Sequence, residues 1–122
     1  MEAVRYEFVL PYPPTMNTYW RKFRNHMVIS KKGRAFRTAV CLALKGVKPL
    51  EGQLLMRIRA YPPDRRKRDI DNIQKPLLDA LEKAGAFVDD SQVAVLITMR
   101  RDPVRGGRTE VLIKQIRGSN ET

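Results

Sequence analysis

The sequence is poor in the residues that build several common kinds of site. It has one cysteine, Cys41, and one histidine, His26, so an intrachain disulfide and a cysteine zinc site are both excluded. We expect Cys41 to be a small buried or half-buried thiol on a helix. No apolar run approaches the roughly 20 residues of a membrane-spanning helix, and Glu2 and Arg5 interrupt any signal peptide at the start. We therefore expect a cytoplasmic protein.

Acidic residues are also few. Lys and Arg number 24 against 13 Asp and Glu in 122 residues, which gives a net charge of +11 and a pI near 10.3. The hydrophobic content of 43% is ordinary for a globular protein, so this charge is no sign of disorder. The surplus favours nucleic acid as partner, because cationic side chains displace counterions from phosphates. An anionic membrane is the less favoured alternative, since no basic amphipathic helix is apparent.

The periodicity of apolar residues predicts one α+β domain. A period of two predicts four strands, over residues 4–10, 53–61, 93–99 and 109–116. Residues 18–29 have no clean period, although residues 27–29 are compatible with a short strand. Helical spacing predicts two main helices, over residues 32–45 and 72–84. We expect a mixed sheet of about four strands with both helices packed on it, formed by residues 1–116, and a frayed tail at 117–122.

Three aspartates stand out beside the basic run at residues 65–68. Asp69 and Asp71 project to the same side if their segment is extended, and Asp90 lies at the entrance of a later strand. Two carboxylates ~4 Å apart repel by about 4 kcal/mol at an effective dielectric of about 20. A Mg²⁺ or Mn²⁺ ion would reverse that sign and bridge the carboxylates to phosphate. The alternative is capping, with Asp71 at a helix start and Asp89 or Asp90 at a turn.

Lys75 and the basic groups also admit two interpretations. Lys75, four residues after Asp71, can hold the scissile phosphate or stabilise the leaving oxygen; equally, it can pair with Asp71 or Asp79 on a helix surface. The Lys and Arg groups are either solvated faces or, as the surplus favours, a surface that follows phosphates. Among them, Tyr19, Trp20 and Phe23 can stack on bases, although contacts in the core or in a dimer are the favoured interpretation.

Taken together, these residues resemble the RusA-type Holliday-junction resolvases, a family of small endodeoxyribonucleases. The resemblance covers about residues 5–116 and is carried by PPDRRKRDIDNIQK at 62–75 and DALEKAGAFVDDSQV at 79–93, with PYPPTMNTYWR at 11–21 and GGRTEV at 106–111. It implies that Asp69, Asp71 and Asp90 are metal-binding catalytic carboxylates and that Lys75 is a catalytic partner. Asp89 takes the first place in the family's acidic pair, with its role left open.

The resemblance also implies a substrate and an assembly. It implies a homodimer that uses Mg²⁺, with Mn²⁺ as a substitute, to cut four-way junction DNA; neither a membrane nor a small-molecule substrate is implied. A two-fold symmetric junction suits a symmetric dimer. We expect seven cations to hold phosphates: Arg65, Arg66, Lys67, Arg68, Lys31, Lys32 and Arg21. The alternatives are a non-catalytic junction- or RNA-binding protein and a metal nuclease that acts on flaps or RNA.

Overall fold

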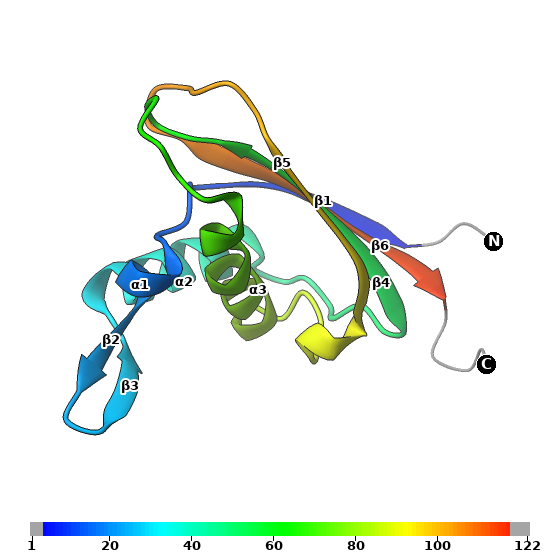
Figure 1. Cartoon of the computed structure of the whole chain (residues 1–122). Coiled ribbons are helices and arrows are strands. Elements are labelled where there is room, and N and C mark those ends of the chain that lie inside the picture. The colour runs from blue at the N-terminus through cyan, green and yellow to red at the C-terminus, as the bar shows by residue number, and fades with distance from the viewer. Residues whose placement is uncertain (1–3, 118–122) are drawn as a thin grey trace.

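A mixed four-stranded sheet with two main helices on one face is the framework of the molecule (Figure 1). A computed structural model describes residues 4–117. The sheet contains β1 (Arg5–Leu10), β4 (Gln53–Tyr61), β5 (Val93–Arg100) and β6 (Arg108–Arg117). The helices are α2 (Lys31–Ala43) and α3 (Gln74–Lys83). The predicted α+β architecture is confirmed, and the predicted elements agree with the observed ones to within a few residues.

The strand order is β1-β6-β4-β5, and it fixes where β5 begins. β6 is antiparallel to both β1 and β4, whereas β4 and β5 are parallel. A parallel pair needs a crossover, and the chain makes it through a 3₁₀ turn η1 (Ile70–Ile73), helix α3 and a second turn η2 (Asp90–Gln92). The crossover therefore places Asp90 three residues before Val93, which begins β5 and pairs with Leu54 of β4.

The core lies between the sheet and the helices. Alternate residues of β4 face it, and Leu54, Met56 and Ile58 are completely buried. Helices α2 and α3 contribute apolar stripes, which include Val40 and Leu77. Complete burial of an aliphatic side chain is worth about 1.5–3 kcal/mol, so this layer holds the helices firmly against the sheet.

Residues 16–29, for which the sequence predicts only a strand at 27–29, form three short elements. These are α1 (Met16–Tyr19) and a hairpin of β2 (Trp20–Phe23) and β3 (His26–Ile29), which stands apart from the main sheet (Figure 1). Tyr19 is fully buried. Its hydroxyl donates to Asp79 of α3 and accepts from Arg37 of α2, whose guanidinium also pairs with Asp79 at 2.8 Å. Burial, reinforced by the bond to Asp79, raises the pKa of Tyr19 to about 12.

A close backbone contact fixes how α2 meets α1. A Cβ atom on Gly33 would lie 2.3 Å from the carbonyl oxygen of Tyr19 and 2.8 Å from the side chain of Ile29. Ser30 caps α2 by accepting from the Gly33 amide at 2.9 Å. Any side chain at position 33 would push α2 away from the base of the hairpin.

Several local predictions have clear outcomes. Gly46 and Gly85 follow α2 and α3 with φ of +84° and +87°, the left-handed conformation that commonly ends a helix, so the predicted helix ranges end close to the observed ones. The prediction of a buried or half-buried Cys41 is wrong: the residue is exposed, because it lies beside Val40 rather than on the buried stripe of α2. Arg117 ends β6, and the rest of the predicted tail, 118–122, lies outside the described residues. Within 4–117, no helix has the length and apolar content to cross a membrane.

Candidate functional site

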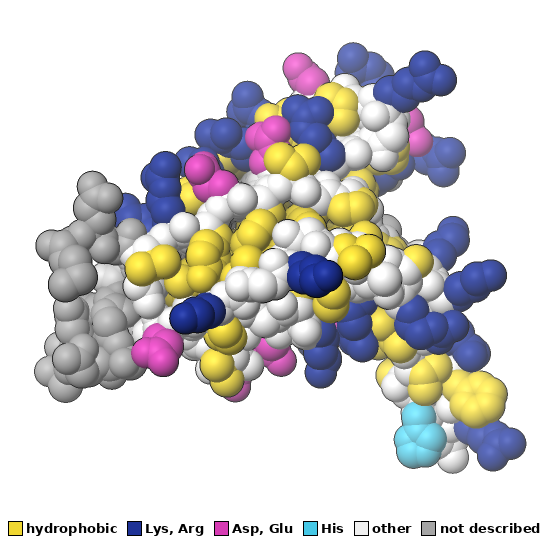
Figure 2. Space-filling view, turned by 180° about the vertical axis from the view of Figure 1, so that it is seen from behind, with side chains coloured by type: hydrophobic (Ala, Val, Ile, Leu, Met, Phe, Trp, Pro, Cys, Tyr) yellow, Lys and Arg dark blue, Asp and Glu magenta, His cyan; other side chains and the backbone are white. Residues whose placement is uncertain are grey.

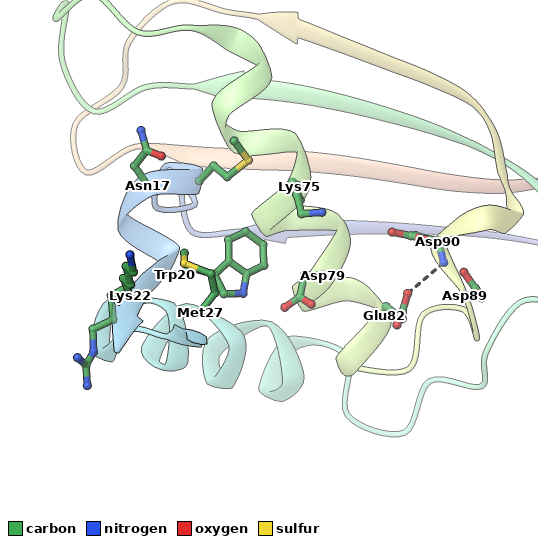
Figure 3. A pocket seen from close by; sticks show the side chains of 11 residues that line it. Asn17, Trp20, Lys22, Met27, Lys75, Asp79, Glu82, Asp89 and Asp90 are labelled. Carbon is green, nitrogen blue, oxygen red and sulfur yellow. Dashed lines mark hydrogen bonds between the residues drawn. The ribbon is translucent and has the colours of Figure 1, made fainter. Parts of the chain in front are cut away.

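A cleft of about 950 Å³ separates α3 from the β2–β3 hairpin (Figure 3). Charges of both signs line it. Acidic side chains and Lys75 come from α3 and the loop that follows it, and cationic and apolar side chains come from α1, β2 and β3. The lining residues are Met16, Asn17, Trp20, Arg21, Lys22, Met27, Lys75, Asp79, Glu82, Asp89 and Asp90.

The acidic side contains a converging group of carboxylates. Oxygen atoms of Glu82, Asp89 and Asp90 all lie within 4.8 Å of one another. Glu82 Oε1 also accepts a hydrogen bond from the Asp90 amide at 3.0 Å, which ties α3 to η2 (Figure 3). Hard carboxylate oxygens at an exposed position that can retain water are what Mg²⁺ and Mn²⁺ prefer. The donor set therefore fits a divalent cation.

The loop that presents Asp90 is held by its neighbours. Asp89 accepts from the Ser91 amide at 2.9 Å, so its predicted capping role is confirmed, and this hydrogen bond lowers the pKa of the Asp89 carboxyl. The Gln92 side chain accepts from the amides of Val88 and Asp89 and donates to the carbonyls of Leu50 and Gly52. The motif DDSQV thus combines an exposed acid, Asp90, with residues that fix its backbone.

Lys75 faces the same cleft from α3. Lys75, Asp79 and Glu82 are spaced four and three residues apart, which places them on one helix face. The Lys75 ammonium lies 5.9 Å from the centroid of the Trp20 ring. Among residues 4–117, neither Asp71 nor Asp79 forms an ion pair with Lys75, and Asp79 is bonded to Arg37 and Tyr19 instead. Lys75 therefore adds a positive charge to the cleft that contains the carboxylates of Glu82, Asp89 and Asp90.

Asp69 and Asp71 lie outside this converging group. Asp69 lines a separate hollow of about 410 Å³ with Thr15, Lys67 and Asn72, and Asp71 is exposed in η1. The condition for Asp69 and Asp71 to project to the same side, an extended segment, is not met, because η1 begins at Ile70 and a 3₁₀ turn rotates successive side chains by about 120°. Within one chain, the structure thus brings Asp90 together with Asp89 and Glu82.

Several lining residues were missing from the sequence-based site, among them Glu82 and Met27. Glu82 was not considered, although its spacing from Lys75 and Asp79 on the exposed face of α3 was a usable signal. Met27 was not considered either; it is 66% exposed and reaches the cleft because β3 pairs with β2, which places Met27 opposite Lys22. No periodicity in residues 18–29 predicts that placement.

The basic run at 65–68 lies on a loop at one end of the sheet. Arg65, Arg66 and Lys67 are exposed. Arg68 is more enclosed: its guanidinium bonds Asp64 at 2.7 Å, and its carbonyl accepts from Arg100 at 2.6 Å. Arg68 and the Arg66 amide lower the pKa of Asp64 to about 2. Three of the four predicted phosphate contacts in this run are therefore open to solvent, and the fourth has an internal partner.

The other predicted contacts occupy two further places. Lys31 and Lys32 are exposed in the first turn of α2, which contains no acid. Cations at a helix N-terminus are repelled by the positive end of the helix dipole. The cations and the dipole both attract anions, however, so this position suits a phosphate. Arg21 lies on the hairpin. Figure 2 shows Lys and Arg gathered at the loop end of the sheet and around this hairpin, which the lone histidine marks.

Comparison with known proteins bears directly on this site. The family profile described as "Endodeoxyribonuclease RusA" matches residues 11–114. A protein of Enterobacteria phage 82 named crossover junction endodeoxyribonuclease rusA is 40% identical over 114 residues, which are 91% of this chain and 95% of the phage protein. The protein of the same name from Escherichia coli K12 is 38% identical over the same shares. The matched region contains every residue of the cleft, and the chain belongs to the RusA family of endodeoxyribonucleases.

Proposed function

We propose that this protein is a metal-dependent endodeoxyribonuclease that resolves Holliday junctions by paired, symmetric phosphodiester hydrolysis, in cytoplasmic DNA recombination and repair. The observation that carries the proposal is the carboxylate group of Glu82, Asp89 and Asp90, which faces Lys75 in a cleft bordered by a cationic hairpin. Phosphate repels carboxylates, so this juxtaposition suits a cation that bridges the two. The crossover junction named for the relatives supplies the substrate.

The cofactor in this proposal is Mg²⁺, with Mn²⁺ able to replace it. Such an ion supplies Lewis-acid stabilisation and a bound water of lowered pKa. We assign the metal ligands to Asp69, Asp71 and Asp90. Asp89 and Glu82 add oxygens beside Asp90. Lys75 stabilises negative charge on the phosphate or the leaving oxygen.

We further propose that the active state is a homodimer. The symmetry of the substrate supports it. A four-way junction is two-fold symmetric, so an isologous dimer presents one cleft to each of two opposed strands. Asp69 and Asp71 lie outside the Asp90 group in one chain, so joint ligation by the three aspartates would require a rearrangement.

The dimer is tested by sedimentation velocity. We expect a species with twice the chain mass of 14.1 kDa at the concentrations that support paired cleavage. Mixing active chains with chains carrying Asp69→Asn should give junctions nicked on one strand. A monomer that makes both cuts would contradict the proposal.

The activity is tested by offering the protein a four-way junction, a flap, a linear duplex and an RNA hairpin with Mg²⁺ or with EDTA. We expect cleavage of the four-way junction alone, only with the metal, and loss of cleavage in Asp69→Asn. Tight junction binding without cleavage would favour the non-catalytic binding protein. Comparable cleavage of flaps or RNA would favour a nuclease with another substrate.

A further inference from the structure

The β2–β3 hairpin projects from the molecule, and its charged side chains are all cationic. Its sequence, WRKFRNHMVI over 20–29, contains three cations and no acid. In Figure 1 the hairpin extends away from the sheet, and its turn is the part farthest from the core. Nothing within residues 4–117 packs over its tip, where Phe23 pairs with His26. The element therefore presents its tip to solvent, beyond the residues that line the cleft.

Phe23 is the notable side chain at this tip. Its side chain is 49% exposed, and it is the one aromatic residue among the large exposed hydrophobic residues of the described chain. The guanidinium carbons of Arg21 and Arg24 each lie 5.4 Å from the centre of its ring. An aromatic ring flanked by cations is the combination that binds unpaired bases, because the ring stacks while the cations contact phosphates.

The backbone at the tip is strained in a way that keeps this arrangement. Arg24 has φ of 56°, and it is the one non-glycine residue in the described chain with positive φ. Such a conformation normally favours Gly or Asn. Here an arginine occupies it, and the turn directs its guanidinium over the Phe23 ring. Strain of this kind is typical of functional positions.

The hairpin also lies at a defined place relative to the carboxylates. Side chains alternate along a strand, so Trp20 and Lys22 of β2 share one face with Met27 of β3, and all three line the cleft that contains Asp90. Phe23 is three residues from Trp20, which is about 10 Å along a strand. Since nucleotides follow one another every ~3.4 Å along a strand, the tip reaches about three nucleotides from the cleft.

From these observations we propose that Phe23 stacks on a base at the branch point of the DNA, with Arg21 and Arg24 on the adjoining phosphates; this inference rests on the proposed resolvase function. In a continuous duplex, both faces of an interior base are already stacked, so the Phe23 ring could stack on a base only if two neighbouring base pairs were unstacked. At a branch point, stacking is interrupted and a base can offer an open face. The hairpin would thus distinguish branched from linear DNA.

The test replaces Phe23 with Ala and measures binding in the presence of EDTA. Because Phe23→Ala removes the stacking contact with one base, we expect its junction affinity to fall by about 5- to 150-fold. Its affinity for linear duplex should stay within about twofold. Phe23→Trp should retain the junction affinity, because it keeps an aromatic platform. Leu42→Ala is the matched control, since Leu42 is 70% exposed on α2 and lines no part of the cleft.

A second measurement locates the contact. A 2-aminopurine base at the branch point should change its fluorescence when the wild-type protein binds, and this change should be lost with Phe23→Ala. Equal losses of junction and duplex affinity, unchanged junction affinity, or conversion of a dimer to monomers by Phe23→Ala would each overturn the inference. If the wild-type protein binds the branch point in this way but never cleaves, the proposed function fails while the stacking contact stands.

Discussion

Replacing Asp90 with Asn should reduce single-turnover cleavage of a four-way junction by at least about a hundredfold, because under the proposed function Asp90 would be a metal ligand and the substitution removes its charge. Junction affinity, measured without metal, should change by less than about threefold, since the substitution removes no cation that holds phosphate. Asn keeps the size of the side chain, and the Asp90 amide can still donate to Glu82. The loss would therefore report chemistry rather than folding.

Two further variants make this result specific. Glu7→Gln is the matched control, because Glu7 is an exposed acid paired with Arg5 on β1, remote from the cleft. Glu82→Gln tests the additional oxygen in the group: its amide oxygen can still accept from the Asp90 amide, so only the charge is removed. Normal cleavage by Asp90→Asn would refute its assignment as a ligand. Normal cleavage by Glu82→Gln would restrict Glu82 to holding the loop.

Junction affinity should fall by a factor on the order of a thousand when salt rises from 50 to 200 mM, as expected for about six phosphate contacts. The expectation follows from the net charge of +11 and from the exposed cations on the 62–68 loop, the start of α2 and the hairpin. A plot of log affinity against log salt, measured with EDTA present, gives the number of contacts. A flat dependence would contradict a phosphate-following surface.

Individual cations should change this slope unequally. Arg65→Gln should reduce its magnitude by about 1, because Arg65 is exposed. Arg68→Gln should reduce it by less, because the Arg68 guanidinium is already bonded to Asp64 at 2.7 Å. Equal effects of the two variants would show that Arg68 leaves Asp64 when DNA binds.

The sequence predicted those parts of the fold that depend on local periodicity. β4 alternates buried and exposed residues without interruption, and α2 and α3 bury single apolar stripes, so their positions were correct. The element α1 could not be predicted, because burial of Tyr19 depends on Asp79, 60 residues away in sequence. The relative direction of the Asp69 and Asp71 side chains could not be predicted, because it depends on where the 3₁₀ turn begins.

The predictions of the site residues succeeded and failed for the same reasons. Asp90 at the entrance of a strand and Lys75 on a helix follow from element order, and the structure places both in one cleft. The contact of Glu82 with the Asp90 amide depends on the crossover, which brings the chain back beside α3. Asp69 and Asp71 stay a prediction from the family resemblance, which a single chain leaves untested.

The buried tyrosine at the base of the hairpin also has a mechanical consequence. Tyr19 directly precedes Trp20, and its hydroxyl is bonded to Asp79, one helical turn from Lys75. The hairpin is therefore attached to α3 at its base through Tyr19, and Phe23 lies at its free end. The orientation of the hairpin relative to the helix that carries Lys75 therefore depends on the contact between Tyr19 and Asp79.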